Sequence, residues 1–115
     1  ATLSQLPQGN TARSVVMRVR FNDDSATHYL VSWGGSTNGL SYGFEKTQIQ
    51  GCSSVWGDNK CFPDQTFVNI WATYVITYDG ANNTARYYKN GIQINNGQTH
   101  GTVNTTGTTI KLGTS

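Results

Sequence analysis

The stretch WATYVITYDGANNTARYYKNG, residues 71–91, decides the fold of this chain. Over residues 72–78 every second side chain is alanine, tyrosine or isoleucine, and β-branched residues stand between them. This period of two predicts a strand with one face turned to a core. Tyr74, Ile76 and Tyr78 should lie on that buried face.

Two turns follow this strand. Asp79-Gly80 is a turn signal that ends it, and a second strand is expected to return through residues 86–89. Asn90-Gly91 then makes a two-residue reversal, because both residues tolerate the positive φ that a type I′ turn requires. The sequence therefore predicts an antiparallel β-meander.

Shorter alternating segments precede the meander. Residues 14–21 alternate an apolar face with a face that carries arginines, as in a half-solvated antiparallel strand. Residues 28–33 place Tyr29 and Trp33 on one apolar face, and residues 40–44 form another alternation. Short strands separated by turn signals, with no helical pattern of useful length, predict an all-β sandwich of two antiparallel sheets.

Length and composition limit the function. A chain of 115 residues is expected to form a single domain, residues 1–115. Only 12% of the residues are charged, against roughly a quarter in an average soluble protein. The net charge of +2 is scattered along the chain, so the basic stripe of a nucleic-acid-binding protein is missing. No apolar run approaches the roughly 20 residues of a membrane span.

The meander also carries a family pattern. The segments NIW at 69–71, TYDG at 77–80 and NG at 90–91, followed by TTIKLG at 108–113, resemble the laminin-G-like and concanavalin A-like jelly-roll family. The resemblance implies a two-sheet jelly-roll sandwich. It says little about the ligand, since this fold hosts lectins, glycan hydrolases and adhesion modules.

The resemblance also implies strands that this sequence does not contain. Family members have a strand before the counterpart of Ser14 and another after the counterpart of Gly113. We therefore expect a sandwich that lacks one or more terminal strands, as in an excised or truncated part of a longer chain. Either the N-terminal segment fills the gap, or a neighbouring subunit supplies a strand to the open edge.

The cysteines and two sequons indicate an extracellular protein. Cys52 and Cys61 are the only cysteines, and a disulfide between them is favoured over two free thiols or a metal site. Asn82 and Asn104 begin N-x-T glycosylation sequons in predicted turns.

The sequence argues against an enzyme. The family's glycan hydrolases use two glutamates on one strand, whereas Glu45 is the only glutamate here and the aspartates fall in predicted turns. His28 and His100 have no evident nucleophile partner in the sequence.

The best candidate for a binding surface is the turn that carries Trp56, Asp58, Asn59 and Lys60. The indole could stack on a sugar ring while the polar side chains hold its hydroxyl groups, and the disulfide would preorganise the turn. In the alternative, Trp56 plugs one end of the sandwich and its neighbours only shape the turn. Asn38 belongs to a second candidate loop.

The other two tryptophans are expected to pack inside the fold. Trp33 is in phase with Val31 of its strand, and Trp71 is a fixed point of the family pattern. Neither is predicted to contact a ligand.

Calcium is the one cofactor that the sequence suggests. Asp23 and Asp24 in one turn, with Asp58 or Asp64 from another, could supply hard oxygen ligands, as some laminin-G-like domains do. Adjacent aspartates also occur as plain turn formers, so both interpretations stay open.

Together these features predict a secreted or cell-surface, non-enzymatic, carbohydrate-binding or adhesion module whose partner is a glycan or glycoprotein. The alternative is a structural subunit of an extracellular filament, coat or appendage. Such a subunit would form homo-oligomers or polymers by strand completion between copies.

Overall fold

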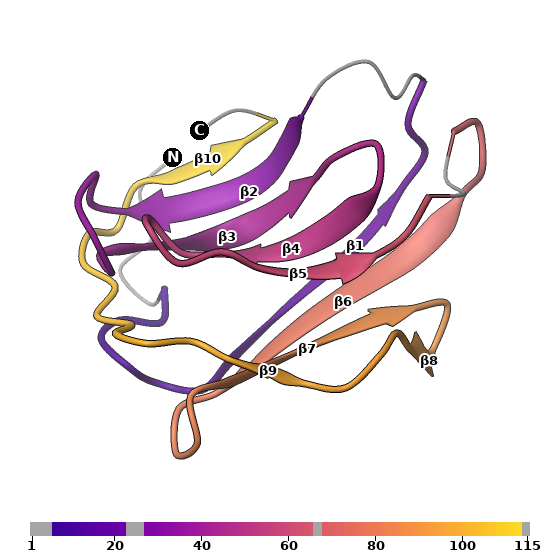
Figure 1. Cartoon of the computed structure of the whole chain (residues 1–115). Coiled ribbons are helices and arrows are strands. Elements are labelled where there is room, and N and C mark those ends of the chain that lie inside the picture. The colour runs from indigo at the N-terminus through magenta and orange to yellow at the C-terminus, as the bar shows by residue number, and fades with distance from the viewer. Residues whose placement is uncertain (1–5, 23–26, 66–67, 114–115) are drawn as a thin grey trace.

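The computed structural model describes residues 6–22, 27–65 and 68–113, which form strands and no helix (Figure 1). No helix in this part of the chain is therefore long and apolar enough to cross a membrane. The strands are β1 (Arg13–Val19), β2 (His28–Gly34), β3 (Ser41–Lys46), β4 (Gln50–Ser54), β5 (Lys60–Pro63), β6 (Ala72–Asp79), β7 (Thr84–Lys89), β8 (Ile92–Gln93), β9 (Gln98–Thr99) and β10 (Ile110–Leu112).

The strands form two antiparallel sheets that pack face to face as a β-sandwich (Figure 1). One sheet has the order β10-β2-β3-β4-β5. The other has the order β1-β6-β7-β8, and β9 also pairs with β7. The prediction of an all-β, two-sheet fold is confirmed at this level.

The predicted meander is present with its expected turn. β6 pairs with β7, so that Tyr74 lies opposite Lys89 and Tyr78 opposite Ala85. Asn90 and Gly91 have φ values of 51° and 82°, as the positive-φ turn requires. Local sequence signals are therefore enough to fix the turn between β7 and β8.

Aromatic side chains from both sheets fill the core. Tyr74 and Ile76 are fully buried and Tyr78 is 2% exposed, as the alternation predicted. Tyr74 contacts Phe44 of the opposite sheet, with ring centroids 5.8 Å apart. These rings join the two layers, because each inner face offers large apolar area to the other.

Two predictions about aromatic residues are wrong. The register between β2 and β3 shifts between Tyr29 and Val31, which is a β-bulge. Val31 therefore faces the core, whereas Tyr29 pairs with Glu45 on the outer face and is 37% exposed. Trp71, expected to pack inside, is 59% exposed because it precedes the first residue of β6.

Candidate functional site

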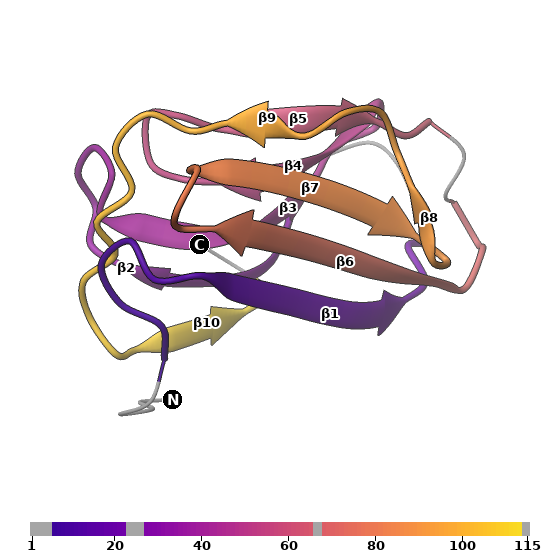
Figure 2. The same ribbon diagram turned by 90° about the horizontal axis from the view of Figure 1, so that it is seen from below.

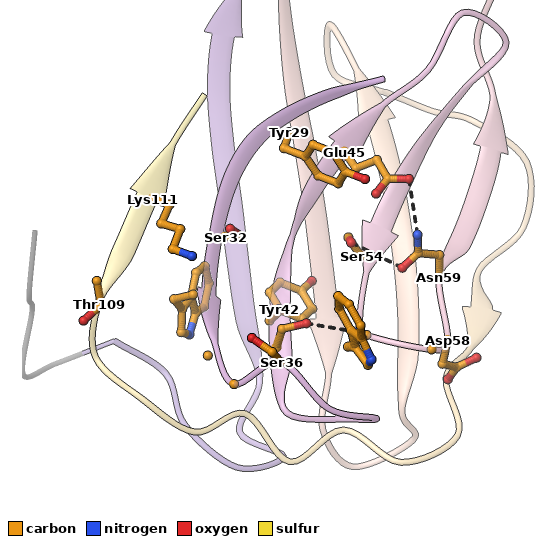
Figure 3. A pocket seen from close by; sticks show the side chains of 16 residues that line it. Tyr29, Ser32, Ser36, Tyr42, Glu45, Ser54, Asp58, Asn59, Thr109 and Lys111 are labelled. Atoms are coloured by element: carbon orange, nitrogen blue, oxygen red, sulfur yellow. Dashed lines mark hydrogen bonds between the residues drawn. The ribbon is translucent and has the colours of Figure 1, made fainter. Parts of the chain in front are cut away.

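A groove of about 720 Å³ crosses the outer face of the β10-β2-β3-β4-β5 sheet (Figure 3). Lys111 of β10 pairs with Ser32 of β2, which pairs with Gly43 of β3. Gly43 pairs in turn with Ser54 of β4. A Cβ at Gly43 would lie 2.2 Å from the Val31 carbonyl oxygen. Ser32, Gly43 and Ser54, in the middle of this row, are small, which leaves room for a ligand.

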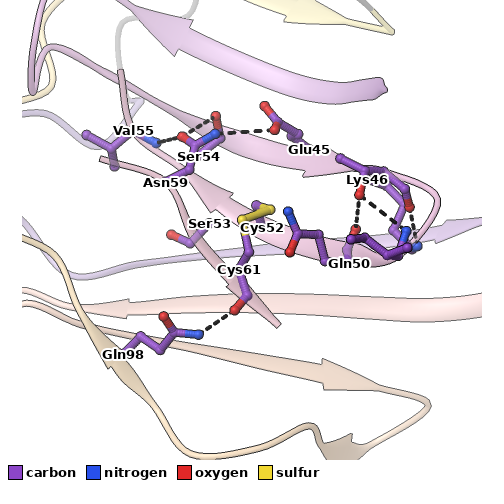
Figure 4. The surroundings of a disulfide bond; sticks show 12 residues. Glu45, Lys46, Gln50, Cys52, Ser53, Ser54, Val55, Asn59, Cys61 and Gln98 are labelled. Atoms are coloured by element: carbon purple, nitrogen blue, oxygen red, sulfur yellow. Dashed lines mark hydrogen bonds between the residues drawn. A yellow bond between two sulfur atoms is a disulfide. The ribbon is translucent and has the colours of Figure 1, made fainter. Parts of the chain in front are cut away.

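A second row of side chains runs beside the first. Tyr29 pairs with Glu45, and Glu45 pairs with Cys52 of β4. Cys52 is bonded to Cys61 of β5, which confirms the predicted disulfide (Figure 4). The disulfide therefore lies in the same row of paired residues as Tyr29 and Glu45. It links β4 and β5, the two strands on either side of the turn that carries Trp56.

The backbone of Trp56 is fixed while its ring is free. Its amide donates to Ser41 Oγ at 3.0 Å, and its carbonyl accepts from the Gly39 amide at 3.0 Å. The indole is 54% exposed and lines the groove. Trp56 is therefore a surface residue at the groove, and not a plug inside the sandwich.

Asn59 organises the polar side of the groove. Its Oδ1 accepts from the Val55 amide at 3.1 Å and from Ser54 Oγ at 3.2 Å. Its Nδ2 donates to Glu45 Oε1 at 3.2 Å (Figure 3). Burial raises the pKa of Glu45, and the hydrogen bonds from Asn59 and Ser54 oppose that rise. This network holds one carboxyl group and one amide in a defined geometry.

The remaining predicted binding residues lie around the same turn. Asp58 lines the groove, and its Oδ1 is 3.0 Å from Lys60 Nζ. Asn38 is exposed on the adjoining loop and packs against Gly57, where a Cβ would lie 2.5 Å from Asn38 Oδ1. Asn38 supports the turn without lining the groove.

A buried hydrogen-bonded chain connects this turn to the core. His100 Nδ1 is 3.3 Å from Asp58 Oδ2, and His100 Nε2 is 2.9 Å from Ser53 Oγ. Burial lowers the pKa of His100 despite the nearby carboxylate, which favours the neutral ring. His100 therefore has a hydroxyl partner that the sequence did not reveal. Because Ser53 is fully buried, this chain of Asp, His and Ser has a structural geometry without access for a substrate.

The calcium prediction lies largely outside the described residues, since Asp23 and Asp24 are not among them. Asp58 is occupied by Lys60 and by the Gly101 amide, which donates to Oδ2 at 2.6 Å. Across residues 6–22, 27–65 and 68–113, no group of three or more His, Cys, Asp or Glu side chains is arranged to hold a metal ion.

Asp64, the other aspartate considered for calcium, belongs to a buried ionic cluster. Its Oδ1 is 2.8 Å from Lys89 Nζ, and its Oδ2 accepts from the Tyr87 hydroxyl at 2.9 Å. Lys46 Nζ is 4.0 Å from Oδ2 and donates to the carbonyl oxygens of Asp64 and Thr47. Lys46 is fully buried, and this burial lowers the pKa of its amine to about 8.

The buried lysine predicts an unusual dependence of stability on pH. Between about pH 8 and pH 10, folded Lys46 loses its proton while the unfolded lysine keeps it. The unfolded chain then binds more protons at this position, so Lys46 should raise the free energy of unfolding by about 2 kcal/mol over this range, relative to a variant without it. Above about pH 10 it should fall, because burial raises the pKa of Tyr42 and Tyr74 to about 12.

Urea denaturation at a series of pH values measures this profile. The Lys46→Met variant should lack the rise between pH 8 and pH 10 but keep the fall at higher pH. Wild-type and Lys46→Met free energies of unfolding that change in parallel through pH 8–10 would contradict the assignment.

Both sequon asparagines are exposed, as a glycosylation acceptor must be. Asn82 lies in the turn between β6 and β7, where its side-chain amide donates to Asp79. Asn104 lies in the segment between β9 and β10. Their modification stays a prediction.

Sequence reasoning placed the turn correctly but missed the sheet face beside it. Tyr29, Glu45, Ser32 and Lys111 become neighbours only through the pairing of three strands, β10, β2 and β3. The alternation of residues 28–33 gave no indication of the bulge between Tyr29 and Val31. The position of Glu45 next to the core residue Phe44 in an alternating strand could have indicated that its side chain lies on the outer face of the sheet.

Comparisons of the chain with protein-family models, curated proteins and solved structures gave no match. The functional argument therefore depends on the geometry of the groove.

Proposed function

We propose that the groove binds a neutral oligosaccharide and that the chain is a non-enzymatic carbohydrate-binding or adhesion module. The observation that carries this proposal is the presence of two exposed aromatic rings, Tyr29 and Trp56, in one groove with fixed polar side chains. Aromatic faces pack on the C–H faces of sugar rings, and few precisely placed polar groups set orientation in such sites. The laminin-G-like jelly-roll topology and an extracellular location belong to the same proposal.

The charges of the groove support a neutral ligand. Glu45 and Lys111 contribute one carboxyl and one ammonium group, and Asp58 is paired with Lys60. Neither positive nor negative charge dominates in the groove, so its charges do not favour a strongly ionic ligand. Recognition would depend on ring stacking and on hydrogen bonds from Asn59 and the groove serines.

The chain offers a matched pair of tryptophans for the test. Trp56 and Trp71 are 54% and 59% exposed, but only Trp56 lines the groove. We expect Trp56→Ala to weaken oligosaccharide binding at least about tenfold, because an aromatic anchor that becomes covered on binding contributes about 1.4 kcal/mol or more. Trp71→Ala should leave the Kd unchanged.

The measurement starts with a glycan array, and the best neutral oligosaccharide is then titrated by calorimetry into wild type and both variants. Silence of the folded wild-type protein across the array would refute carbohydrate binding. Equal losses in the two variants would remove the groove as the site.

Assembly by strand completion is a second candidate function, and one observation favours it. The edge of β1 that faces away from β6 has no partner strand among the described residues. The chemistry of that edge decides what could pair with it.

A further inference from the structure

The core of the sandwich is incompletely covered along one side. Inward-facing residues of β6, such as Tyr74 and Ile76, are fully buried. Three inward-facing residues of β1 are only half-buried, namely Val15, Met17 and Val19. Leu112 of β10 pairs with Val31 and so belongs to the core side, yet it is 69% exposed. Apolar side chains on the core side of β1 and β10 therefore remain partly exposed at this edge of the sandwich.

Both open edges belong to the same side of the molecule. Figure 2 shows β1 and β10 along one side, with β5 and β9 along the other. The β5 side is bridged, since the Gln98 side-chain amide donates to the Cys61 carbonyl (Figure 4). On the open side, a cleft of about 300 Å³ is lined by Val19, Phe21, Leu30 and other residues at the end of β1 and the start of β2. A strand beside β1 would cover this cleft.

The charges around the cleft restrict what such a strand could be. Arg18 and Arg20 lie on the outer face of β1 and its extension, whereas Lys111 lies on the outer face of the opposite sheet. The sequences of β1, RSVVMRV, and β10, IKL, contain no acidic residue. A second copy of β1 would add further arginines to a face that is already cationic, which disfavours self-pairing.

We propose that the free edge of β1 binds an extended segment of another polypeptide in which apolar and acidic residues alternate. The backbone of the segment would hydrogen-bond to β1, as in other cases of strand addition. Its apolar side chains would cover Met17 and Leu112, and its carboxylates would face Arg18 and Arg20 on the outer face of the β1 sheet. Period-two alternation in the ligand follows from the pleat of the sheet.

Two synthetic peptides test the proposal on the intact chain: a capped peptide that alternates valine with glutamate, and a matched one that alternates valine with lysine. Calorimetry should show the glutamate peptide binding at least about tenfold more tightly than the lysine peptide. Amide hydrogen exchange should show new protection in β1, from Ser14 to Val19, when the glutamate peptide is bound.

The double variant Arg18→Glu, Arg20→Glu should invert the preference between the two peptides, with folding checked by its circular dichroism. Trp56→Ala should bind the glutamate peptide as wild type does, which separates this site from the groove. Equal affinities in wild type, no binding of either peptide, or protection confined to another strand would overturn the proposal. A concentration-dependent dimer with protected β1 amides would also overturn it, in favour of a second copy of this chain.

Discussion

The Arg13→Met variant is expected to lose about 3 kcal/mol of folding free energy, as measured by the shift of the urea unfolding curve. The guanidinium group is buried and donates to Thr105 Oγ1 at 2.6 Å, to the Gly9 carbonyl at 2.9 Å and to the Thr11 carbonyl at 2.8 Å. Hydrogen bonds from a charged donor contribute about 1.5–3 kcal/mol each. The cost of burying the cation offsets part of that sum, which leaves the smaller net loss.

Two aromatic rings strengthen the same site. The guanidinium carbon lies 4.9 Å from the Tyr42 ring centre and 5.6 Å from the Tyr78 ring centre. Each desolvated cation–π contact contributes about 1–2 kcal/mol. Methionine replaces part of the packing volume, but it removes the donor to the Thr105 hydroxyl and the Thr11 carbonyl, while the Gly9 carbonyl keeps only the Thr105 amide.

Arg18 in the same strand is the matched control. It is exposed, and it donates to Thr73 Oγ1 at 3.1 Å. Arg18→Met should therefore change stability by less than about 0.5 kcal/mol. Equal effects of the two substitutions would show that burial and the partners of Arg13 contribute nothing specific.

The parts of the fold that could be predicted are those encoded by neighbours in sequence. The alternation around Tyr74 and Ile76 specifies the buried face of β6, and the Asn90-Gly91 turn specifies the reversal from β7 to β8, without help from the rest of the chain. The exposure of Trp71 could not be predicted in the same way, because it depends on whether another segment covers the start of β6.

The groove was only partly predictable for a related reason. The turn with Trp56 and Asn59 is marked by polar and glycine residues, so a surface site there follows from sequence. Tyr29 reaches that site only because a bulge reverses the direction of its side chain. The contact between His100 and Ser53 joins residues far apart in sequence, and no local pattern reports it.

Removal of the disulfide is the second large effect that we expect. The Cys52→Ala, Cys61→Ala double variant should lose about 2.5 kcal/mol, because the cross-link limits the freedom of the unfolded chain between positions nine residues apart. Chemical denaturation under non-reducing conditions measures the loss. Hydrogen exchange should rise first in β4 and β5, which the bond joins across the sheet.

The single variants show whether the cross-link itself is responsible. Cys52→Ala and Cys61→Ala each break the same bond, so each should lose as much as the double variant, within about 0.5 kcal/mol. Additive losses would mean instead that the two side chains stabilise the fold by separate packing contacts, which would fit the complete burial of Cys52. The consequence for the groove differs between these cases. Loss of a cross-link loosens the turn that carries Trp56 and weakens ligand binding together with stability, whereas loss of packing alone leaves the folded turn, and therefore the Kd for oligosaccharide, unchanged.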